Sequence, residues 1–323
     1  MQIEFPGFFD LQVNGFAGID FNEPCTPEQL QRAITTQRKT GVTQFLPTLI
    51  TSSLENFVSC ARAIVSFSDP AIVGIHMEGP YISPEDGPRG AHPRASVYAA
   101  SIEDFKLRQD AAQGKIVLVT LAPEVPNAIM LIEYLVANNI KVAIGHTAAS
   151  PEQIRDAVKA GATLSTHLGN GCANLLPRHP NFIWEQLAAD ELLASFIVDG
   201  HHLPAATVTS MGRAKTTART ILVTDAIAAA GCMPGIYHFS GMQIELSANG
   251  RVAVPGAPNL AGSALAMNNA VANTVKFTGL PIADVLPMAS TISASYLGIQ
   301  PLGKVIADWD EEHYSLTVKT VVS

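Results

Sequence analysis

The sequence predicts an α/β protein built as a (β/α)8 barrel, and three observations support this fold. About eight short apolar segments, most of them rich in β-branched residues, are typical of buried strands. Segments with the spacing of amphipathic helices lie between most of them, so strand and helix alternate along the chain. Polar residues follow several of the strands directly, and a parallel barrel carries its active groups at that end.

Each predicted element has a local signal. Capping sequences open two of the helices, Thr26-Pro27-Glu28-Gln29 and Ser150-Pro151-Glu152-Gln153. An open, doubly wound sheet is the alternative, but no G-x-G-x-x-G follows the first strand. The helices are expected at 27–39, 54–66, 102–113, 126–137 and from 151 onward. The strands are expected at 8–15, 42–46, 72–77, 116–121, 141–146, 163–167, 193–198 and 220–225.

Composition narrows the classes of function. The chain has 323 residues, 47% of them hydrophobic, and a formal net charge of −8, which argues against nucleic acid as the main partner. No apolar run approaches the roughly 18 residues of a membrane span. Four cysteines lie far apart, and the N-terminus lacks the pattern of a signal peptide. A reduced, cytoplasmic protein is therefore expected, with a small anionic molecule still possible as its ligand.

The polar residues at strand ends form a candidate metal site. Glu78 ends the third predicted strand, His146 the fifth and His167 the sixth. Two histidines and one carboxylate, with a position left open, are the ligands of catalytic zinc and of non-haem iron. Asp225 ends the eighth strand and is a candidate functional carboxylate. His76 lies inside the third strand, and we expect it to be a hydrogen-bonded core residue.

A series of motifs runs along the chain: His76-Met77-Glu78-Gly79-Pro80, Gly90-Ala91-His92, Gly145-His146-Thr147, Thr166-His167-Leu168-Gly169-Asn170, Asp199-Gly200-His201-His202, Val223-Thr224-Asp225-Ala226 and Leu260-Ala261-Gly262-Ser263. Together these motifs resemble those of the N-acetylglucosamine-6-phosphate deacetylases in the amidohydrolase superfamily. The resemblance runs in order from about Pro6 to Lys304 and is specific as a set.

The resemblance implies a role for each matching residue. It assigns the metal to Glu78, His146 and His167, proton transfer to Asp225, and polarisation of the acetyl carbonyl or sugar binding to His92. Gln12 and Asn14 replace the His-x-His of many amidohydrolases, so one divalent metal per chain, Zn or Fe, is expected. The implied substrate contacts are Ala91, His92, Asn170, Gly171, His202, Leu260, Ala261 and Gly262, with Arg178 at the spacing of a phosphate-binding arginine donated across a homodimer interface.

The implied reaction is hydrolysis of N-acetylglucosamine 6-phosphate to glucosamine 6-phosphate and acetate. Residues Arg178 to Glu185 and His201 depart from the commonest family pattern, so another amino sugar, or an unphosphorylated one, is an alternative. A non-catalytic sugar-binding barrel would not need Glu78, His146, His167 and Asp225 together. A Schiff-base aldolase would need a lysine at the mouth of the barrel, and none is expected there.

The resemblance also predicts how the chain is divided. Family members begin with strands of a small β-sandwich, whereas only five residues precede Pro6. We therefore expect a TIM-like barrel of the metal-dependent hydrolase type over residues 1–304, with a reduced or missing sandwich. A β-hairpin insertion at 236–254 should turn at Asn249-Gly250. Residues 305–323 should form a tail or strand of a residual small β domain.

Overall fold

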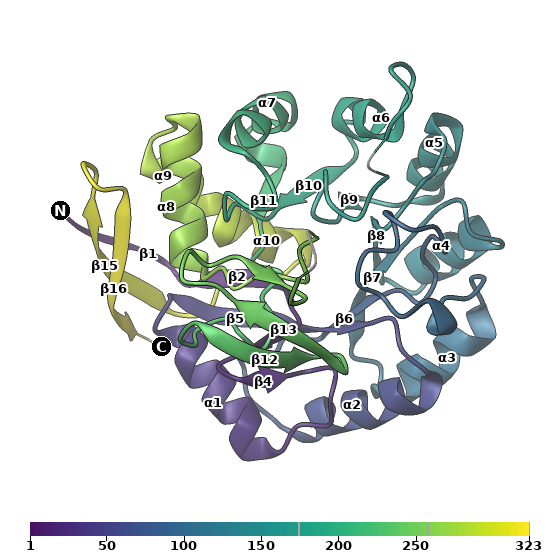
Figure 1. Ribbon diagram of the computed structural model, residues 1–323, viewed down its shortest axis with the longest axis horizontal. Coiled ribbons are helices and arrows are strands. Elements are labelled where there is room, and N and C mark those ends of the chain that lie inside the picture. The colour runs from purple at the N-terminus through teal and green to yellow at the C-terminus, as the bar shows by residue number, and fades with distance from the viewer. Residues whose placement is uncertain (174, 257–258, 323) are drawn as a thin grey trace.

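The computed structural model describes residues 1–173, 175–256 and 259–322. Its eight-stranded central sheet has the order β11-β10-β9-β8-β7-β6-β5-β2, and every neighbouring pair is parallel. These strands confirm the predicted barrel (Figure 1). Their bounds are β2 (Phe8–Val13), β5 (Val42–Ile50), β6 (Ile75–Glu78), β7 (Ile116–Leu121), β8 (Lys141–Ile144), β9 (Leu164–Ser165), β10 (Leu193–Phe196) and β11 (Thr220–Leu222).

The barrel closes between β2 and β11 through side chains and single backbone contacts. Asp10 of β2 accepts hydrogen bonds from the Thr224 hydroxyl at 2.5 Å and from the Thr224 amide at 3.3 Å. The amide of Asp225 donates to the Gln12 carbonyl at 3.0 Å, and Val13 pairs with Ala226 in a parallel bridge. Burial raises the pKa of Asp10 to about 7, although these donors oppose the rise.

Helices surround the barrel, as Figure 1 shows. The strands are buried on both faces, β5 along its whole length, because side chains fill the barrel and helices cover it. The predicted capping boxes at Thr26 and Ser150 are both present. The α-helices are α1 (Pro27–Arg38), α2 (Leu54–Ser66), α3 (Ile102–Ala111), α4 (Ala128–Ala137), α5 (Pro151–Ala160), α6 (Phe182–Ala188), α7 (Ala205–Lys215), α8 (Met267–Thr278), α9 (Ile282–Val285) and α10 (Thr291–Tyr296).

Short 3-10 helices add to this ring at Arg94–Ser96, Thr217–Arg219 and Leu286–Ala289. Within the described ranges, no helix has both the length and the apolar character to cross a membrane.

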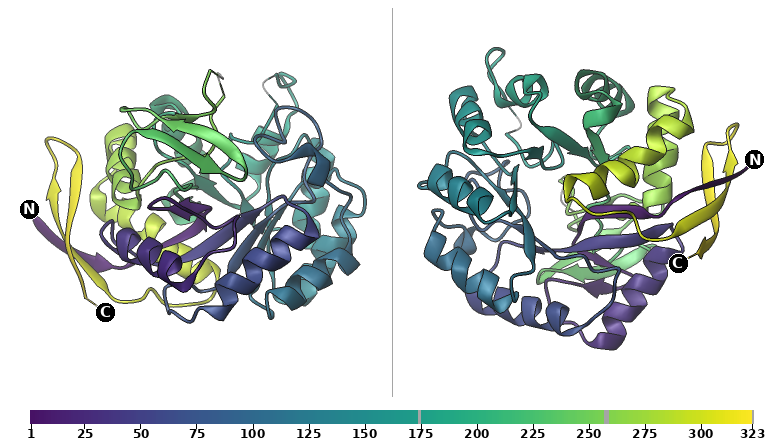
Figure 2. Two further views of the ribbon diagram at one scale, coloured as in Figure 1. Left: turned by 60° about the horizontal axis from the view of Figure 1, so that its bottom comes forward. Right: turned by 180° about the vertical axis from the view of Figure 1, so that it is seen from behind.

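A small antiparallel sheet lies beside the barrel and holds both ends of the chain (Figure 2). It consists of β1 (Gln2–Pro6), β15 (Lys304–Asp310) and β16 (Ser315–Val322), with β15 in the centre. The predicted C-terminal strand is present as β16, while residue 323 lies outside the described residues. The expected boundary at 304 places β1 with the barrel, but its backbone pairs with β15 instead.

A second antiparallel sheet lies over one end of the barrel (Figure 2). Its strands are β12 (Gly235–Phe239), β13 (Met242–Leu246) and β14 (Val252–Ala253), so the predicted hairpin is present. The predicted turn is wrong: Ser240 and Gly241 join β12 to β13, both with positive φ, as a two-residue hairpin turn requires. Asn249-Gly250 belongs to the longer connection from β13 to β14.

This three-stranded sheet is fixed to the barrel in two ways. Its apolar residues Phe239 and Ile244 form a buried cluster with Ile50 and Ile227, which come from the barrel side. The amide of Ser240 also donates to the Asp20 carboxylate at 2.7 Å. Asp20 belongs to a short hairpin of β3 (Gly15–Phe16) and β4 (Ile19–Asp20), directly after β2. The sheet is therefore a fixed cover over the mouth.

Candidate active site

Four barrel strands deliver the candidate catalytic side chains to one cavity. Glu78 is the last residue of β6, while His146, His167 and Asp225 follow the ends of β8, β9 and β11. The cavity has a volume of about 690 Å³ and lies at the carboxyl ends of the strands. Such a volume suits a small-molecule ligand. Every site residue predicted from the sequence lines this cavity except Arg178.

Three of these residues share an unusual backbone conformation. His146 has φ of 50°, His167 of 30° and Asp225 of 49°. Residues other than glycine rarely adopt positive φ, and such residues concentrate at functional sites. The chain therefore turns sharply as it leaves each strand, at the residue whose side chain enters the cavity.

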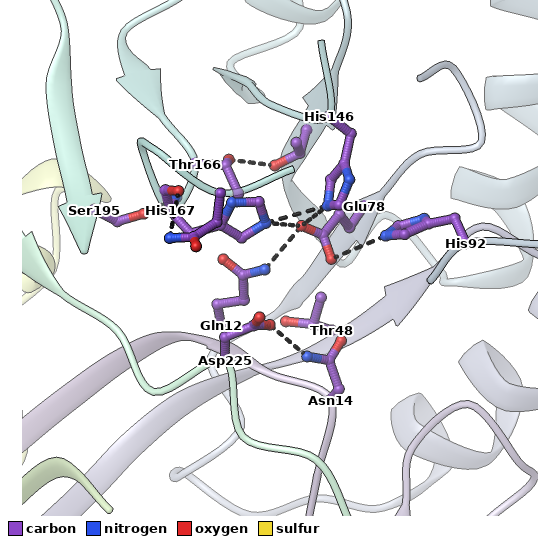
Figure 3. Close-up of polar contacts among 12 residues, drawn as sticks. Gln12, Asn14, Thr48, Glu78, His92, His146, Thr166, His167, Ser195 and Asp225 are labelled. Atoms are coloured by element: carbon purple, nitrogen blue, oxygen red, sulfur yellow. Dashed lines mark hydrogen bonds and ion pairs between the residues drawn. The ribbon is translucent and has the colours of Figure 1, made fainter. Parts of the chain in front are cut away.

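The side chains of Glu78, His146 and His167 meet at one point (Figure 3). Glu78 Oε1 lies 3.1 Å from His167 Nε2 and 3.3 Å from His146 Nε2, and the two Nε2 atoms are 3.2 Å apart. Ligands of a tetrahedral zinc ion, with bonds of about 2.0–2.1 Å, lie roughly 3.3–3.4 Å from one another. The spacing of these three atoms therefore fits a shared divalent cation.

Neighbouring groups hold the two imidazoles in place. His146 Nδ1 lies 2.8 Å from the carbonyl oxygen of Pro88, so Nδ1 carries the proton and Nε2 keeps its lone pair for a cation. A Cβ atom on Gly171 would lie 2.8 Å from His146 Nδ1, so only glycine fits against that ring. The amide of His167 donates to Ser195 Oγ at 2.8 Å, while its Nδ1 has no hydrogen-bond partner among the described residues.

Gln12 and Asn14 reach the carboxylates from β2 and the residue after it. Gln12 Nε2 donates to Glu78 Oε1 at 2.8 Å, and Asn14 Nδ2 donates to Asp225 Oδ1 at 2.7 Å (Figure 3). These two residues, which replace the His-x-His of many amidohydrolases, therefore contact the two carboxylates of the candidate site.

Electrostatics differ between those two carboxylates. Burial opposes ionisation of Glu78, but its close contacts with the imidazoles of His146 and His167 outweigh burial and hold the pKa of Glu78 well below the usual value. His167 is affected in the opposite direction: burial lowers its pKa, but Glu78 outweighs this and raises it. Burial and then the nearby charge of Glu78 raise the pKa of Asp225 to about 6. A carboxylate whose pKa lies near 6 can both accept and return a proton around neutral pH.

His92 forms a second possible ligand group with Glu78 and His146, whose ligand atoms all lie within 4.8 Å of one another. The spacing is looser than in the first group, because His92 Nε2 lies 3.8 Å from Glu78 Oε2. Its Nδ1 lies 2.7 Å from Thr51 Oγ1, and burial holds the pKa of His92 well below the usual value. A neutral imidazole held in this way is suited to donate one hydrogen bond into the cavity.

The candidate substrate contacts lie around the rim. His202 Nδ1 lies 2.7 Å from Asp199 Oδ2, and this contact lowers the pKa of Asp199 against the effect of its burial. The Asn170 amide group donates to the His167 carbonyl at 3.3 Å, so this loop is tied to the candidate metal ligands. The remaining predicted contacts that line the cavity are Ala91, His92, Gly171, Leu260, Ala261 and Gly262.

Arg178 is the one predicted site residue that this chain does not bring into the cavity. It is exposed on the loop between β9 and α6. His76 is a core residue, as expected: it is buried between Thr48 and Thr120 at hydrogen-bonding distance, and burial lowers its pKa to about 4. His201 lies beside the cover sheet, with Nε2 3.1 Å from the Asn249 carbonyl.

Sequence reasoning missed several residues that line the cavity. Phe239, Met242 and Val254 come from the cover sheet or its edge, and Asp86 and Cys172 come from loops after β6 and β9. The hairpin itself was predicted, but its alternating pattern does not tell where it docks. Loops after barrel strands were a usable signal, because such loops build the active face of a barrel.

Comparisons with known proteins place the chain in a family. The model of the amidohydrolase family matches residues 3–309. The chain is 32% identical over 300 residues to an N-acetylgalactosamine-6-phosphate deacetylase of Escherichia coli O157:H7, covering 91% of this chain and 78% of the relative. It is 35% identical over 310 residues to the human N-acetylglucosamine-6-phosphate deacetylase, covering 91% and 74%.

Solved structures agree with this assignment. A mutant N-acetyl-D-glucosamine-6-phosphate deacetylase from Mycobacterium smegmatis, in complex with N-acetyl-D-glucosamine-6-phosphate, superposes with a TM-score of 0.91. The sequence identity is 28%, and the match covers 99% of this chain and 86% of that structure. The chain belongs to the amidohydrolase family and, within it, to the group that contains the N-acetylglucosamine-6-phosphate and N-acetylgalactosamine-6-phosphate deacetylases.

Proposed function

We propose that the protein hydrolyses the acetamide of an N-acetylated amino sugar 6-phosphate, with N-acetylglucosamine 6-phosphate as the foremost substrate. The observation that carries this proposal is the position of Asp225: a carboxylate with a pKa of about 6 shares one cavity with the Glu78, His146 and His167 cluster. Amide hydrolysis needs a group that moves a proton from water to the leaving amine, next to a group that activates both water and carbonyl.

One divalent cation per chain, Zn or Fe, would be held by Glu78 Oε1 and the Nε2 atoms of His146 and His167. When bound, such a cation supplies Lewis acidity and makes water nucleophilic near neutral pH. The mutual spacing of 3.1 to 3.3 Å favours this group over the one that contains His92. Gln12 and Asn14 donate to Glu78 and Asp225 where a second pair of histidine ligands would stand, which favours a single metal.

The chain's own groups then carry the proton and the developing charge. Asp225 takes a proton from the attacking water and returns it to the nitrogen of the leaving amine. Asn14 holds one oxygen of Asp225 during both steps, so the other oxygen is left for the proton. His92 Nδ1 lies 2.7 Å from Thr51 Oγ1. In the tautomer in which the Thr51 hydroxyl donates to Nδ1, His92 would present Nε2–H to the acetyl oxygen and stabilise the negative charge that forms there.

The sugar and its phosphate would occupy the rim of the cavity. His202, Asn170, Ala91, the Gly171 backbone and the Leu260-Ala261-Gly262 backbone all face that space. Arg178 is exposed outside its own cavity, so we propose that a second copy of the chain donates it to the phosphate. Leu175 and Trp184, close to Arg178 in the sequence, are 90% and 54% exposed, and a homodimer interface at this loop would bury them.

We further propose that the enzyme works in the cytoplasm, since all four of its cysteines are free thiols. Relatives that act on N-acetylglucosamine and on N-acetylgalactosamine phosphates are about equally similar, so both sugars are candidates. An unphosphorylated N-acetyl sugar and a non-catalytic sugar-binding barrel are the remaining alternatives.

The test is acetate release from N-acetylglucosamine 6-phosphate, N-acetylgalactosamine 6-phosphate and unphosphorylated N-acetylglucosamine, with the Asp225→Asn variant as the control for contaminating activity. We expect turnover of at least one phosphorylated sugar, far above that of the unphosphorylated one. Equal turnover with and without phosphate would favour an enzyme for an unphosphorylated N-acetyl sugar. Binding without any acetate release, in protein shown by elemental analysis to hold metal, would favour a non-catalytic sugar-binding barrel.

A further inference from the structure

A second cavity lies outside the barrel, between the sheet and the helices α7 and α8. Its volume is about 300 Å³. Figure 1 shows α7 and α8 side by side over β10 and β11, and the two helices contact each other. The rim includes Arg213 and Thr216 at the C-terminal end of α7, whereas the active site lies at the carboxyl ends of the strands. The two cavities have no lining residue in common.

The inner wall of this second cavity is apolar. Phe196, Val198, Leu222 and Met288 form its buried part. An apolar cavity of about 150 Å³ can bind benzene, so a cavity of about 300 Å³ that is open at its rim has room for a ring with a short chain.

Four of the six threonines in the wall have their hydroxyl protons bonded to backbone carbonyls, whereas Thr216 and Thr217 lie near the rim. The Thr274 hydroxyl donates to the Ala270 carbonyl at 2.7 Å and the Thr278 hydroxyl to the Thr274 carbonyl at 2.6 Å. The Thr220 hydroxyl donates to the Thr216 carbonyl, and the Thr209 hydroxyl lies within 2.8 Å of two carbonyls. Because these protons are already used by the backbone, the side chains offer little to hold water in the cavity.

Gly212 leaves space in the wall of the cavity. Gly212 lies inside α7, where glycine is a poor helix former, and a Cβ atom placed there would have nothing within 4 Å. A larger side chain at position 212 would fill this space, but the residue there is glycine.

The rim supplies a charge. Arg213 is exposed and makes no hydrogen bond or ion pair within the described part of the chain. We propose that this cavity binds a small amphiphilic carboxylate, with its ring or short alkyl chain inside and its carboxylate at Arg213. An apolar chamber with one unpaired cation at its mouth fits that chemistry better than it fits a sugar, whose hydroxyls would find no partners inside.

The test uses 3-phenylpropionate and its uncharged counterpart 3-phenyl-1-propanol, titrated by calorimetry into the full-length protein. We expect both to bind with one site per chain, in the presence of a saturating amino sugar phosphate. In Gly212→Phe, affinity for both should fall about tenfold or more, because the ring fills the space. Gly212→Ala, which adds one methyl group, is the matched control and should still bind.

Arg213→Gln separates the charge from the cavity. It should weaken binding of the acid by about 2- to 5-fold, as an exposed ion pair does, and leave the alcohol unchanged. Should Gly212→Phe fail to fold, methyl-labelled methionine in the wild-type protein gives an independent measurement, because the Met288 methyl resonance should shift on titration. Absence of saturable binding, undiminished binding to folded Gly212→Phe, or binding that leaves Met288 unmoved would each overturn the proposal.

Discussion

Replacing Asp225 by asparagine tests the proposed proton transfer with little change in shape. Asparagine keeps a carbonyl oxygen that can still accept the hydrogen bond from Asn14, which is 2.7 Å long in the wild type. It cannot accept the proton of the attacking water. The substitution also removes one negative charge close to Glu78, but it leaves the Glu78, His146 and His167 cluster intact. Metal content should therefore survive while turnover does not.

The expected magnitude has two parts. Loss of a general acid or base costs about 10²- to 10⁴-fold in rate, so kcat of Asp225→Asn should fall by at least 10²-fold. In the wild type, burial raises the pKa of Asp225 to about 6, and the base must be ionised to act. Activity should therefore be lost as pH falls through the pKa of Asp225, and kcat/KM should be roughly a tenth of its plateau at one pH unit below that pKa. A cation held nearby lowers this pKa, so the acid limb should lie at or below pH 6.

The assay combines steady-state acetate release between pH 4.5 and 8.5 with elemental analysis of the same samples. Metal content at low pH separates protonation of Asp225 from loss of the cation. The reasoning is refuted if Asp225→Asn turns over at near-normal rate. It is also refuted if the variant loses its metal, because Asp225 would then be a ligand and the cluster would be incomplete without it.

Three further predictions concern the surroundings of the site. His167→Ala should lose metal and activity together, whereas His92→Ala should keep its metal and lose turnover; loss of metal from His92→Ala on elemental analysis would favour the second ligand group. Gly171→Ala should lose metal affinity because its Cβ would meet His146. Gly114→Ala is the control: Gly114 also has positive φ, but a Cβ there has open space, so denaturant titrations should show a loss of only about 1–2 kcal/mol of unfolding free energy. Arg178→Ala should raise KM for the phosphorylated sugar by about 10- to 150-fold and leave the unphosphorylated sugar unchanged; equal effects on both would rule out a phosphate contact.

The alternation of elements was predictable because most barrel strands carry a short, mainly apolar run and because capping boxes mark the starts of α1 and α5. The bounds of α2 and β7 agree with the expected 54–66 and 116–121. Strand ends at the mouth were less accurate: β9 covers only Leu164–Ser165, where 163–167 was expected. The chain leaves the ladder there to reach the positive φ of His167, and no residue type in the sequence marks that turn.

The sequence predicted those site residues that follow the ends of barrel strands. It did not predict those that reach the cavity because the sheet of β12, β13 and β14 packs on the barrel. Glu78, His146, His167 and Asp225 follow apolar runs, and a parallel barrel brings such positions to one mouth. The contributions of Phe239 and Met242 depend on how the cover sheet sits on the barrel, which is a long-range packing result. The role of Arg178 is harder still to predict from the sequence, because the phosphate site that it is proposed to contact belongs to another copy of the chain.

The first strand explains how the site is organised without supplying a ligand of its own. Residues two apart on a strand face the same side, and here Asp10, Gln12 and the following Asn14 all point inward. Asp10 closes the barrel on Thr224, Gln12 donates to Glu78 and Asn14 donates to Asp225. One strand therefore fixes the distance between the candidate metal cluster and the proposed base. A histidine pair at positions 12 and 14 would compete for the same carboxylate oxygens, so in this chain the positioning of Asp225 and a second metal site are alternative uses of one strand.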